Sequence, residues 1–121
     1  MPGFEKSPPE LVARFDEVAA RFVAGVDGVP PAQRRKMFGY PALFVGGNLA
    51  TGLFADGWMT RLAPADLAAV LALPGAAPFS PMPGRVMSGY ATLPADVVAD
   101  DDALADWVSR SLRFAGTLPP K

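Results

Sequence analysis

The chain has no cysteine and no histidine among its 121 residues. Without cysteine it can form neither a disulfide nor a thiolate-based metal or redox site. Without histidine it lacks the commonest general base at neutral pH, and the two absences together exclude serine and cysteine triads and nearly all zinc sites. A Walker loop and a dinucleotide-binding glycine motif are also missing. The sequence therefore favours a protein that is not an enzyme and needs no cofactor.

Excess charge of one sign is lacking as well. Eleven basic and twelve acidic residues give a formal net charge of −1, so no overall field attracts the chain to phosphates, and direct nucleic-acid binding is not expected. No apolar run approaches the roughly 20 residues that a membrane span requires. Met1 to Ser7 is polar, with no hydrophobic signal region. We expect a cytoplasmic protein without a membrane-spanning segment.

What is present fits one folded domain over residues 1–121. Half of the residues are hydrophobic, which is enough for a single core without disulfides or a structural metal. The 14 prolines and 12 glycines separate periodic segments and form no low-complexity run.

The first periodic segment is typical of an amphipathic helix. Ser7 is expected to cap it, with Pro8 at the first helical position and Glu10 completing a capping box. Gly25 and the residues after it end the helix. The apolar stripe has helical spacing and comprises Leu11, Phe15, Val18 and Phe22.

Short runs of aromatic and branched residues then predict a meander of strands near residues 35–38, 42–45, 49–54 and 58–62. Turn signals separate these strands, namely Gly46-Gly47-Asn48 and Asp56-Gly57. A short helix over 65–73 should follow, with Leu67, Val70 and Leu71 facing the sheet.

Two further strands are predicted over residues 79–82 and 88–93, joined through Pro83, Gly84 and Arg85. Prolines place the first of them at an edge of the sheet. A final helix is expected over 101–116, with its buried stripe formed by Leu104, Trp107, Val108 and Leu112. Because strands and helices do not alternate strictly, the pattern predicts a two-layer α+β fold with helices against an antiparallel sheet.

Two basic features are candidate contacts. The triplet Arg34, Arg35 and Lys36 is either an anion contact or a solvated strand edge whose charge discourages edge-to-edge pairing, and we favour the edge. The stiff turn from Pro81 to Met87 projects Arg85, which is suited either to paired hydrogen bonds with a carboxylate or phosphate or to a structural contact. We favour the structural role.

Apolar and acidic clusters have similar alternatives. A set of methionines and aromatic residues either lines an adaptable groove or fills the core, and we favour the core: Met37, Met59, Met82, Met87, Phe38, Tyr40, Phe44, Trp58 and Tyr90. Asp100, Asp101 and Asp102 precede the last helix, where helix capping explains them better than metal binding does.

Several segments taken together resemble the TfoX/Sxy N-terminal domain family, in particular its short, single-domain branch. They are Arg35 to Leu43, Gly47-Asn48, Gly52 to Phe54, Phe79 to Arg85, and the terminal Trp107, Leu112, Phe114 and Leu118 to Lys121. The resemblance implies a two-layer α+β fold similar to secretion-chaperone-like and YjbR-type domains, in the order α-β(3 or 4)-α-β(2)-α.

The resemblance also bears on function. The named members of the family are regulators of natural competence that work with other transcription factors, and no enzymatic activity attaches to the domain. Those regulators carry a second, C-terminal helical domain, whereas this chain ends at Lys121. The regulatory role therefore does not carry over directly, and no catalytic or ligand residue transfers from the family.

Our first hypothesis is a non-enzymatic interaction or regulatory module that holds a protein partner by a sheet face or by the turn around Arg85. The alternative is a small-molecule or anion-binding domain that uses an apolar pocket with Arg85, Arg61 and Lys36. An exposed sheet edge would also allow a homodimer. The candidate contact residues are Lys36, Tyr40, Arg61, Arg85 and Tyr90.

Overall fold

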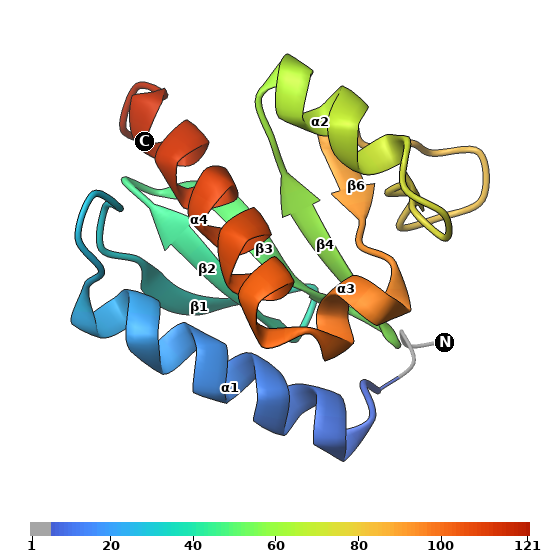
Figure 1. Cartoon of the computed structure of the whole chain (residues 1–121), viewed down its shortest axis with the longest axis horizontal. Coiled ribbons are helices and arrows are strands. Elements are labelled where there is room, and N and C mark those ends of the chain that lie inside the picture. The colour runs from blue at the N-terminus through green and yellow to red at the C-terminus, as the bar shows by residue number, and fades with distance from the viewer. Residues whose placement is uncertain (1–5) are drawn as a thin grey trace.

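The structure is a computed structural model that describes residues 6–121, so most of the expected polar start at Met1 to Ser7 lies outside the described residues. The elements follow the order α1 (Pro9–Ala24), β1 (Gln33–Met37), β2 (Tyr40–Val45), β3 (Asn48–Phe54), β4 (Gly57–Arg61), α2 (Pro64–Leu71), β5 (Ala77–Pro78), β6 (Tyr90–Thr92), α3 (Ala95–Ala99) and α4 (Asp101–Thr117) (Figure 1). This order confirms the predicted α+β class and adds α3 before the last helix.

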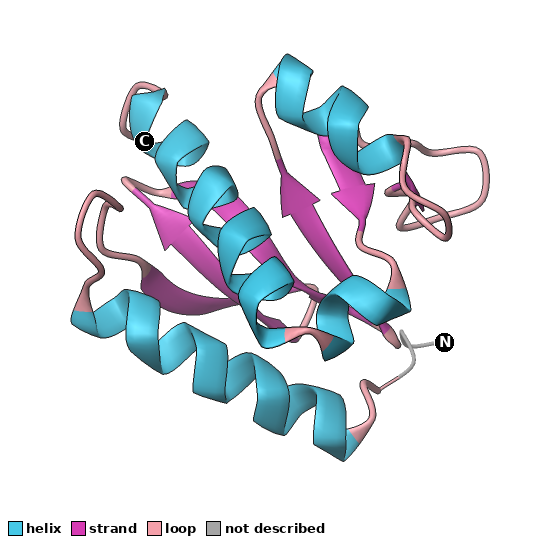
Figure 2. Cartoon of the chain, in the orientation of Figure 1, coloured by secondary structure: helices cyan, strands magenta, loops and turns pink. Residues whose placement is uncertain are grey.

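The strands form one antiparallel sheet in the order β1-β2-β3-β4-β6-β5. The helices gather on one face of it, and α4 runs across the middle of the sheet (Figures 1 and 2). This arrangement is the predicted two-layer architecture. Its two edges differ, because β1 has five residues and β5 has only two.

The main core lies between the helices and the sheet. Phe15 of α1 packs against Trp58 of β4 with ring centroids 5.0 Å apart, and both side chains are almost fully buried. The predicted stripes are largely confirmed, since Leu104, Val108 and Leu112 of α4 have no exposed surface. Trp107 and Leu11 lie at the margin, where they are partly buried against this core.

A second, smaller apolar cluster covers the opposite face of the sheet. Its buried members come from strands β2, β3, β4 and β6 and from the segment after β5: Ala42, Leu49, Met59, Phe79 and Tyr90. Met37, Phe44, Phe54 and Met87 pack against it from partly buried positions. Most of the predicted methionine and aromatic set is therefore packing material, whereas Phe38 and Met82 are exposed.

The start of α1 differs from the prediction. Pro8 occupies the N-cap position, Pro9 begins the helix, and no side chain caps it. The expected cap and capping box at Ser7 and Glu10 are therefore wrong. The Ser7 hydroxyl instead donates a hydrogen bond of 2.6 Å to the carbonyl oxygen of Ala55, which ties the start of α1 to the turn before β4.

Two turns also differ from expectation. Phe38 was predicted as the last residue of a strand, but it has a φ of 55° and forms the β1–β2 turn with Gly39, whose φ is 84°. The β3–β4 hairpin turns at Ala55 and Asp56, because Phe54 pairs with Gly57. The predicted Asp56-Gly57 turn is therefore displaced by one residue, and Ala55 takes the positive φ of 52°.

The predicted strand over 79–82 is wrong in position. The edge strand is β5 at Ala77–Pro78, and Met82 and Arg85 instead form an isolated bridge within the following loop. The Ser80 hydroxyl lies 2.6 Å from the Met82 carbonyl oxygen and 2.9 Å from that of Arg85. This contact closes the proline-rich turn on itself. The prediction that this strand lies at an edge is correct.

Capping explains Asp100, which stands at the N-cap of α4, whereas Asp101 and Asp102 lie in the first turn of the helix. The Asp100 carboxylate accepts a hydrogen bond of 3.0 Å from the backbone N–H of Ala103. Asp101 forms an ion pair of 2.8 Å with Arg14, so it also joins α1 to α4.

Candidate functional site

The edge strand β1 is longer than the other edge strand, β5, and is largely exposed. Four of its five residues, Gln33 to Lys36, are exposed, and three of them are the basic triplet. Within residues 6–121, β1 pairs only with β2. Its other side therefore presents backbone groups that no strand satisfies.

Pro41 determines which backbone groups face outward. It lies opposite Lys36 in the β1–β2 ladder and has no N–H to donate, so this pair is a non-hydrogen-bonded one. The flanking pairs, Met37 with Tyr40 and Arg35 with Ala42, must then carry the ladder hydrogen bonds. It follows that the N–H and C=O of Arg34 and Lys36 point away from β2.

Ala32, just before β1, shows the same outward direction of its backbone groups. The N–H of Ala32 donates a hydrogen bond of 3.1 Å to the carbonyl oxygen of Phe22 on α1. Ala32 is two residues before Arg34, so its backbone points to the same outer side. Helix α1 thus meets the edge at Ala32, whereas no backbone hydrogen bond to Arg34 or Lys36 from this side occurs within the described part of the chain.

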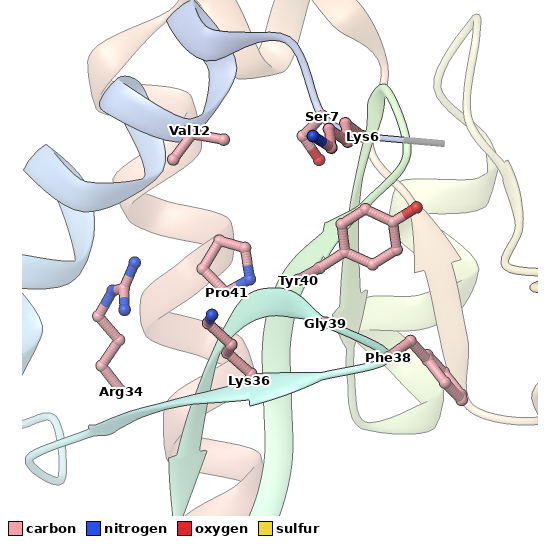
Figure 3. A pocket seen from close by; sticks show the side chains of 9 residues that line it. All are labelled: Lys6, Ser7, Val12, Arg34, Lys36, Phe38, Gly39, Tyr40 and Pro41. Atoms are coloured by element: carbon pink, nitrogen blue, oxygen red, sulfur yellow. The ribbon is translucent and has the colours of Figure 1, made fainter. Parts of the chain in front are cut away.

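A groove lies between α1 and the β1–β2 hairpin. One cavity of about 460 Å³ is lined by Lys6, Ser7, Val12, Arg34, Lys36, Phe38, Gly39, Tyr40 and Pro41 (Figure 3). A shallower hollow of about 380 Å³ continues along α1 and is lined by Asp16, Ala19, Ala20, Val23 and Arg34. Arg34 lines both, so the two hollows are neighbours beside the free edge, and together they are called the groove below.

The groove carries net positive charge. Arg34 is neutralised by Asp16 of α1, which accepts hydrogen bonds of 2.7 and 3.1 Å from its guanidinium group. Lys6 and Lys36 form no ion pair with any residue in the 6–121 range. The two ammonium groups leave the groove basic, and apolar side chains such as Val12 and Val23 form its wall.

Tyr40 and Phe38 form the end of the groove at the hairpin. Tyr40 is buried, and its ring centroid lies 5.1 Å from that of Phe54. Phe38 is 47% exposed and meets Phe54 edge-on at 5.7 Å. The structure therefore brings the predicted contact residues Lys36 and Tyr40 together in one site.

Arg35 points to the other face of the sheet. Its guanidinium carbon lies 5.6 Å from the centre of the Phe44 ring, and its Nη2 donates to the side-chain oxygen of Gln33 at 3.2 Å. Together with Lys36, it places positive charge on both faces of the same edge.

Arg61 and Tyr90 meet at a second place. They are paired across β4 and β6, and the Arg61 guanidinium lies 5.5 Å from the Tyr90 ring centre and 5.7 Å from that of Phe114. Burial raises the pKa of the Tyr90 phenol, while the charge and hydrogen bonding of Arg61 lower it by less. Arg61 is thus held between two rings, in a packing role.

Arg85 stands apart from both places, exposed in the turn closed by Ser80. The cavity that includes Lys36 includes neither Arg61 nor Arg85 among its lining residues. Strand β4 lies three strand spacings from β1, or about 14 Å across the sheet. One small ligand would not span this separation, so the three cations do not form the single pocket expected in the anion-binding alternative.

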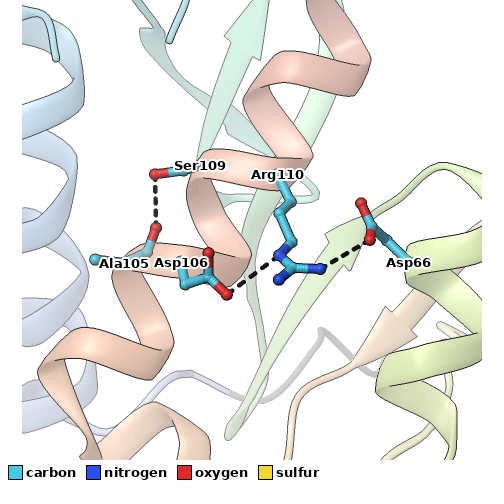
Figure 4. A network of polar contacts seen from close by, with 5 residues as sticks. All are labelled: Asp66, Ala105, Asp106, Ser109 and Arg110. Carbon is cyan, nitrogen blue, oxygen red and sulfur yellow. Dashed lines mark hydrogen bonds and ion pairs between the residues drawn. The ribbon is translucent and has the colours of Figure 1, made fainter. Parts of the chain in front are cut away.

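A polar network between α2 and α4 is not predicted by any pattern in the sequence. Arg110 donates to Asp66 of α2 at 2.9 Å and to Asp106 of its own helix at 3.1 Å (Figure 4). Its guanidinium also lies 4.8 Å from the centre of the Trp107 ring, and the two carboxylates raise its pKa. Arg110 bridges both carboxylates of this network, which is typical of a structural link between helices.

Two other features are absent from the part of the chain that the structure describes. No group of three or more acidic side chains within residues 6–121 is placed to hold a metal ion. Over the same range, no helix combines the length and the apolar character needed to cross a membrane.

Comparison with known protein families identifies a relationship. A family model, the TfoX N-terminal domain, matches residues 24–115. No curated protein and no solved structure matches the chain at a significant level. The matched range begins at the last residue of α1 and includes every strand.

Proposed function

The chain belongs to the TfoX N-terminal domain family, and from this premise we propose that it is a non-enzymatic interaction module with a regulatory role in the cytoplasm. The family resemblance supports a role in the regulation of transcription or competence through contact with another protein. A complete lack of histidine and cysteine supports binding over catalysis.

The exposed edge of β1 is the observation that carries this proposal. Natural sheets commonly cover, shorten, bend or charge such an edge, because its free backbone groups pair readily with another chain. Here the edge carries three consecutive cations and borders a groove. An accessible edge with a charged groove beside it is suited to recognition of a protein segment.

Affinity purification of the tagged full chain from extracts of its own cells tests the proposal. We expect one partner at a stoichiometric amount, retained at moderate salt, and a change in transcript levels when the gene is deleted. Repeated recovery of no partner over a range of salt concentrations, with unchanged transcripts, would contradict a regulatory interaction module.

A second candidate function is supported by the cavity of about 460 Å³ at the hairpin. Lys6 and Lys36 line it without an ion pair inside the described range, so a small carboxylate or phosphate compound is a fitting ligand. Arg61 and Arg85 have no part in this version of the anion-binding hypothesis.

A metabolite screen by thermal shift separates the two functions. A ligand that binds only the folded state raises stability by RT ln(1 + [L]/Kd), which is about 2.7 kcal/mol at a hundredfold excess over Kd. A rise that is lost in the variant Lys36→Gln would favour the small-molecule function, and a flat screen at millimolar concentrations would remove it.

A further inference from the structure

We propose that β1 accepts an extended, acidic segment of a partner protein, which adds a strand to the sheet in the groove between β1 and α1. This inference rests on the proposed function, because it names the kind of partner that the interaction module holds. It also specifies the mode of contact, in which backbone hydrogen bonds supply the register and side chains supply the selectivity.

The backbone part of the site consists of Arg34 and Lys36. Their N–H and C=O groups face outward, because Pro41 cannot donate to the ladder and so makes its pair with Lys36 a non-hydrogen-bonded one. At Ala32 the outer side is already occupied by the Phe22 carbonyl. An added strand therefore begins beyond Ala32 and runs along the two free residues toward the hairpin.

The side-chain part of the site defines the composition of the segment. Alternate side chains of an added strand would point to the α1 side of the sheet and to the opposite side. On the α1 side they would meet Lys36, together with the apolar wall of Val12, Ala20 and Val23. On the opposite side they would meet Arg35. A segment in which acidic residues alternate with small apolar ones would complement the groups on both sides of the sheet.

A second copy of this chain is the less suitable occupant. Antiparallel pairing of two β1 edges about a two-fold axis would place Arg35 opposite its own copy and Arg34 opposite Lys36. Like charges directly opposite one another destabilise a sheet. The charge of the edge thus selects against self-pairing and in favour of an acidic segment.

The test uses the full chain and synthetic peptides. The probe is a capped peptide of about eight residues in which glutamate alternates with valine, enough to span the free edge. One control peptide has lysine in place of every glutamate, and another is N-methylated at every residue, so that neither of its two edges can donate hydrogen bonds to β1. We expect binding of the acidic peptide only, and weaker binding as salt concentration rises.

Three variants of Lys36 separate backbone from charge. Lys36→Gln keeps the outward N–H and should weaken binding by about threefold, whereas Lys36→Glu should weaken it by about tenfold. Lys36→Pro removes the N–H and should weaken binding more than Lys36→Gln does. The matched control is Arg85→Glu, which makes an equivalent charge change in a distant exposed turn and should leave binding unchanged.

Other outcomes overturn the inference. Equal binding of the acidic and N-methylated peptides would show that no strand is added, and loss of binding in Arg85→Glu alone would move the contact to the proline-rich turn. No binding of the acidic peptide at millimolar concentration would also refute it. If a cellular partner is still retained by Lys36→Pro, the interaction module stands and only its assignment to β1 fails.

Discussion

A pair of proline substitutions tests which residues of β1 bond to β2 and which direct their backbone groups outward, since the site depends on this alternation. In Arg35→Pro the lost N–H is one that bonds to β2, where its partner Ala42 is 1% exposed. Leaving that buried carbonyl unsatisfied, together with the lost bond, should lower the free energy of unfolding by about 2 to 4 kcal/mol. In Lys36→Pro the lost N–H faces solvent, so the change should stay within about 1 kcal/mol.

Each proline variant needs its alanine counterpart, because Arg35 also loses its contact with Phe44. The measured quantity is the difference between proline and alanine at the same position, obtained from chemical denaturation curves with a common slope. A loss of unfolding free energy in Lys36→Pro equal to or larger than that in Arg35→Pro would refute this assignment of the ladder hydrogen bonds. It would mean that Lys36, and not Arg35, is bonded to β2.

Three further outcomes test the packing. Thr51 and Thr60 lie opposite each other and are fully buried. The Thr51 hydroxyl accepts a hydrogen bond of 2.9 Å from a buried indole N–H, whereas the Thr60 hydroxyl has no hydrogen-bond partner among residues 6–121. Thr51→Val should therefore lower the free energy of unfolding by about 1 to 3 kcal/mol, and Thr60→Val should not lower it. Gly52→Ala should lower the melting temperature by several degrees, because its Cβ would lie 2.8 Å from that of Ala42; an unchanged value would contradict this packing. Burial raises the pKa of the Tyr90 phenol, so its contribution to the free energy of unfolding is complete below the unfolded-state pKa of about 10 and is lost as pH rises through the folded-state pKa. Tyr90→Phe should therefore flatten the fall in stability at alkaline pH. An identical dependence of stability on pH in the variant would contradict the raised pKa.

The sequence was sufficient for most of the helices and strands because their apolar spacing is regular. The stripe of α4 follows from this spacing, and strands β2 to β4 follow from short apolar runs that turn signals separate. The five-residue helix α3 is too short to show a helical period. The turn at Phe38 was missed because a bulky residue seldom adopts a positive φ.

The site was predictable only in part. The basic triplet and its position at an edge can be predicted from the sequence. Pro41 also indicates, by its missing N–H, which pair of the β1–β2 ladder carries no hydrogen bonds. The groove was not visible, since it depends on where α1 lies against β1, and periodicity gives the buried face of a helix without its position on the sheet. The pairing of Arg34 with Asp16 follows from that same placement, and it leaves Lys36 as the cation of β1 that lines the groove without an ion pair among residues 6–121.

Residue-resolved amide hydrogen exchange tests the availability of the β1 edge most directly. In the free protein the amides of Arg34 and Lys36 should exchange rapidly while that of Arg35 is protected, and the acidic peptide should slow the first two without changing the third. Protection of Arg34 and Lys36 before any peptide is added, or rapid exchange that the bound peptide leaves unaltered, would contradict an open edge that receives a partner strand.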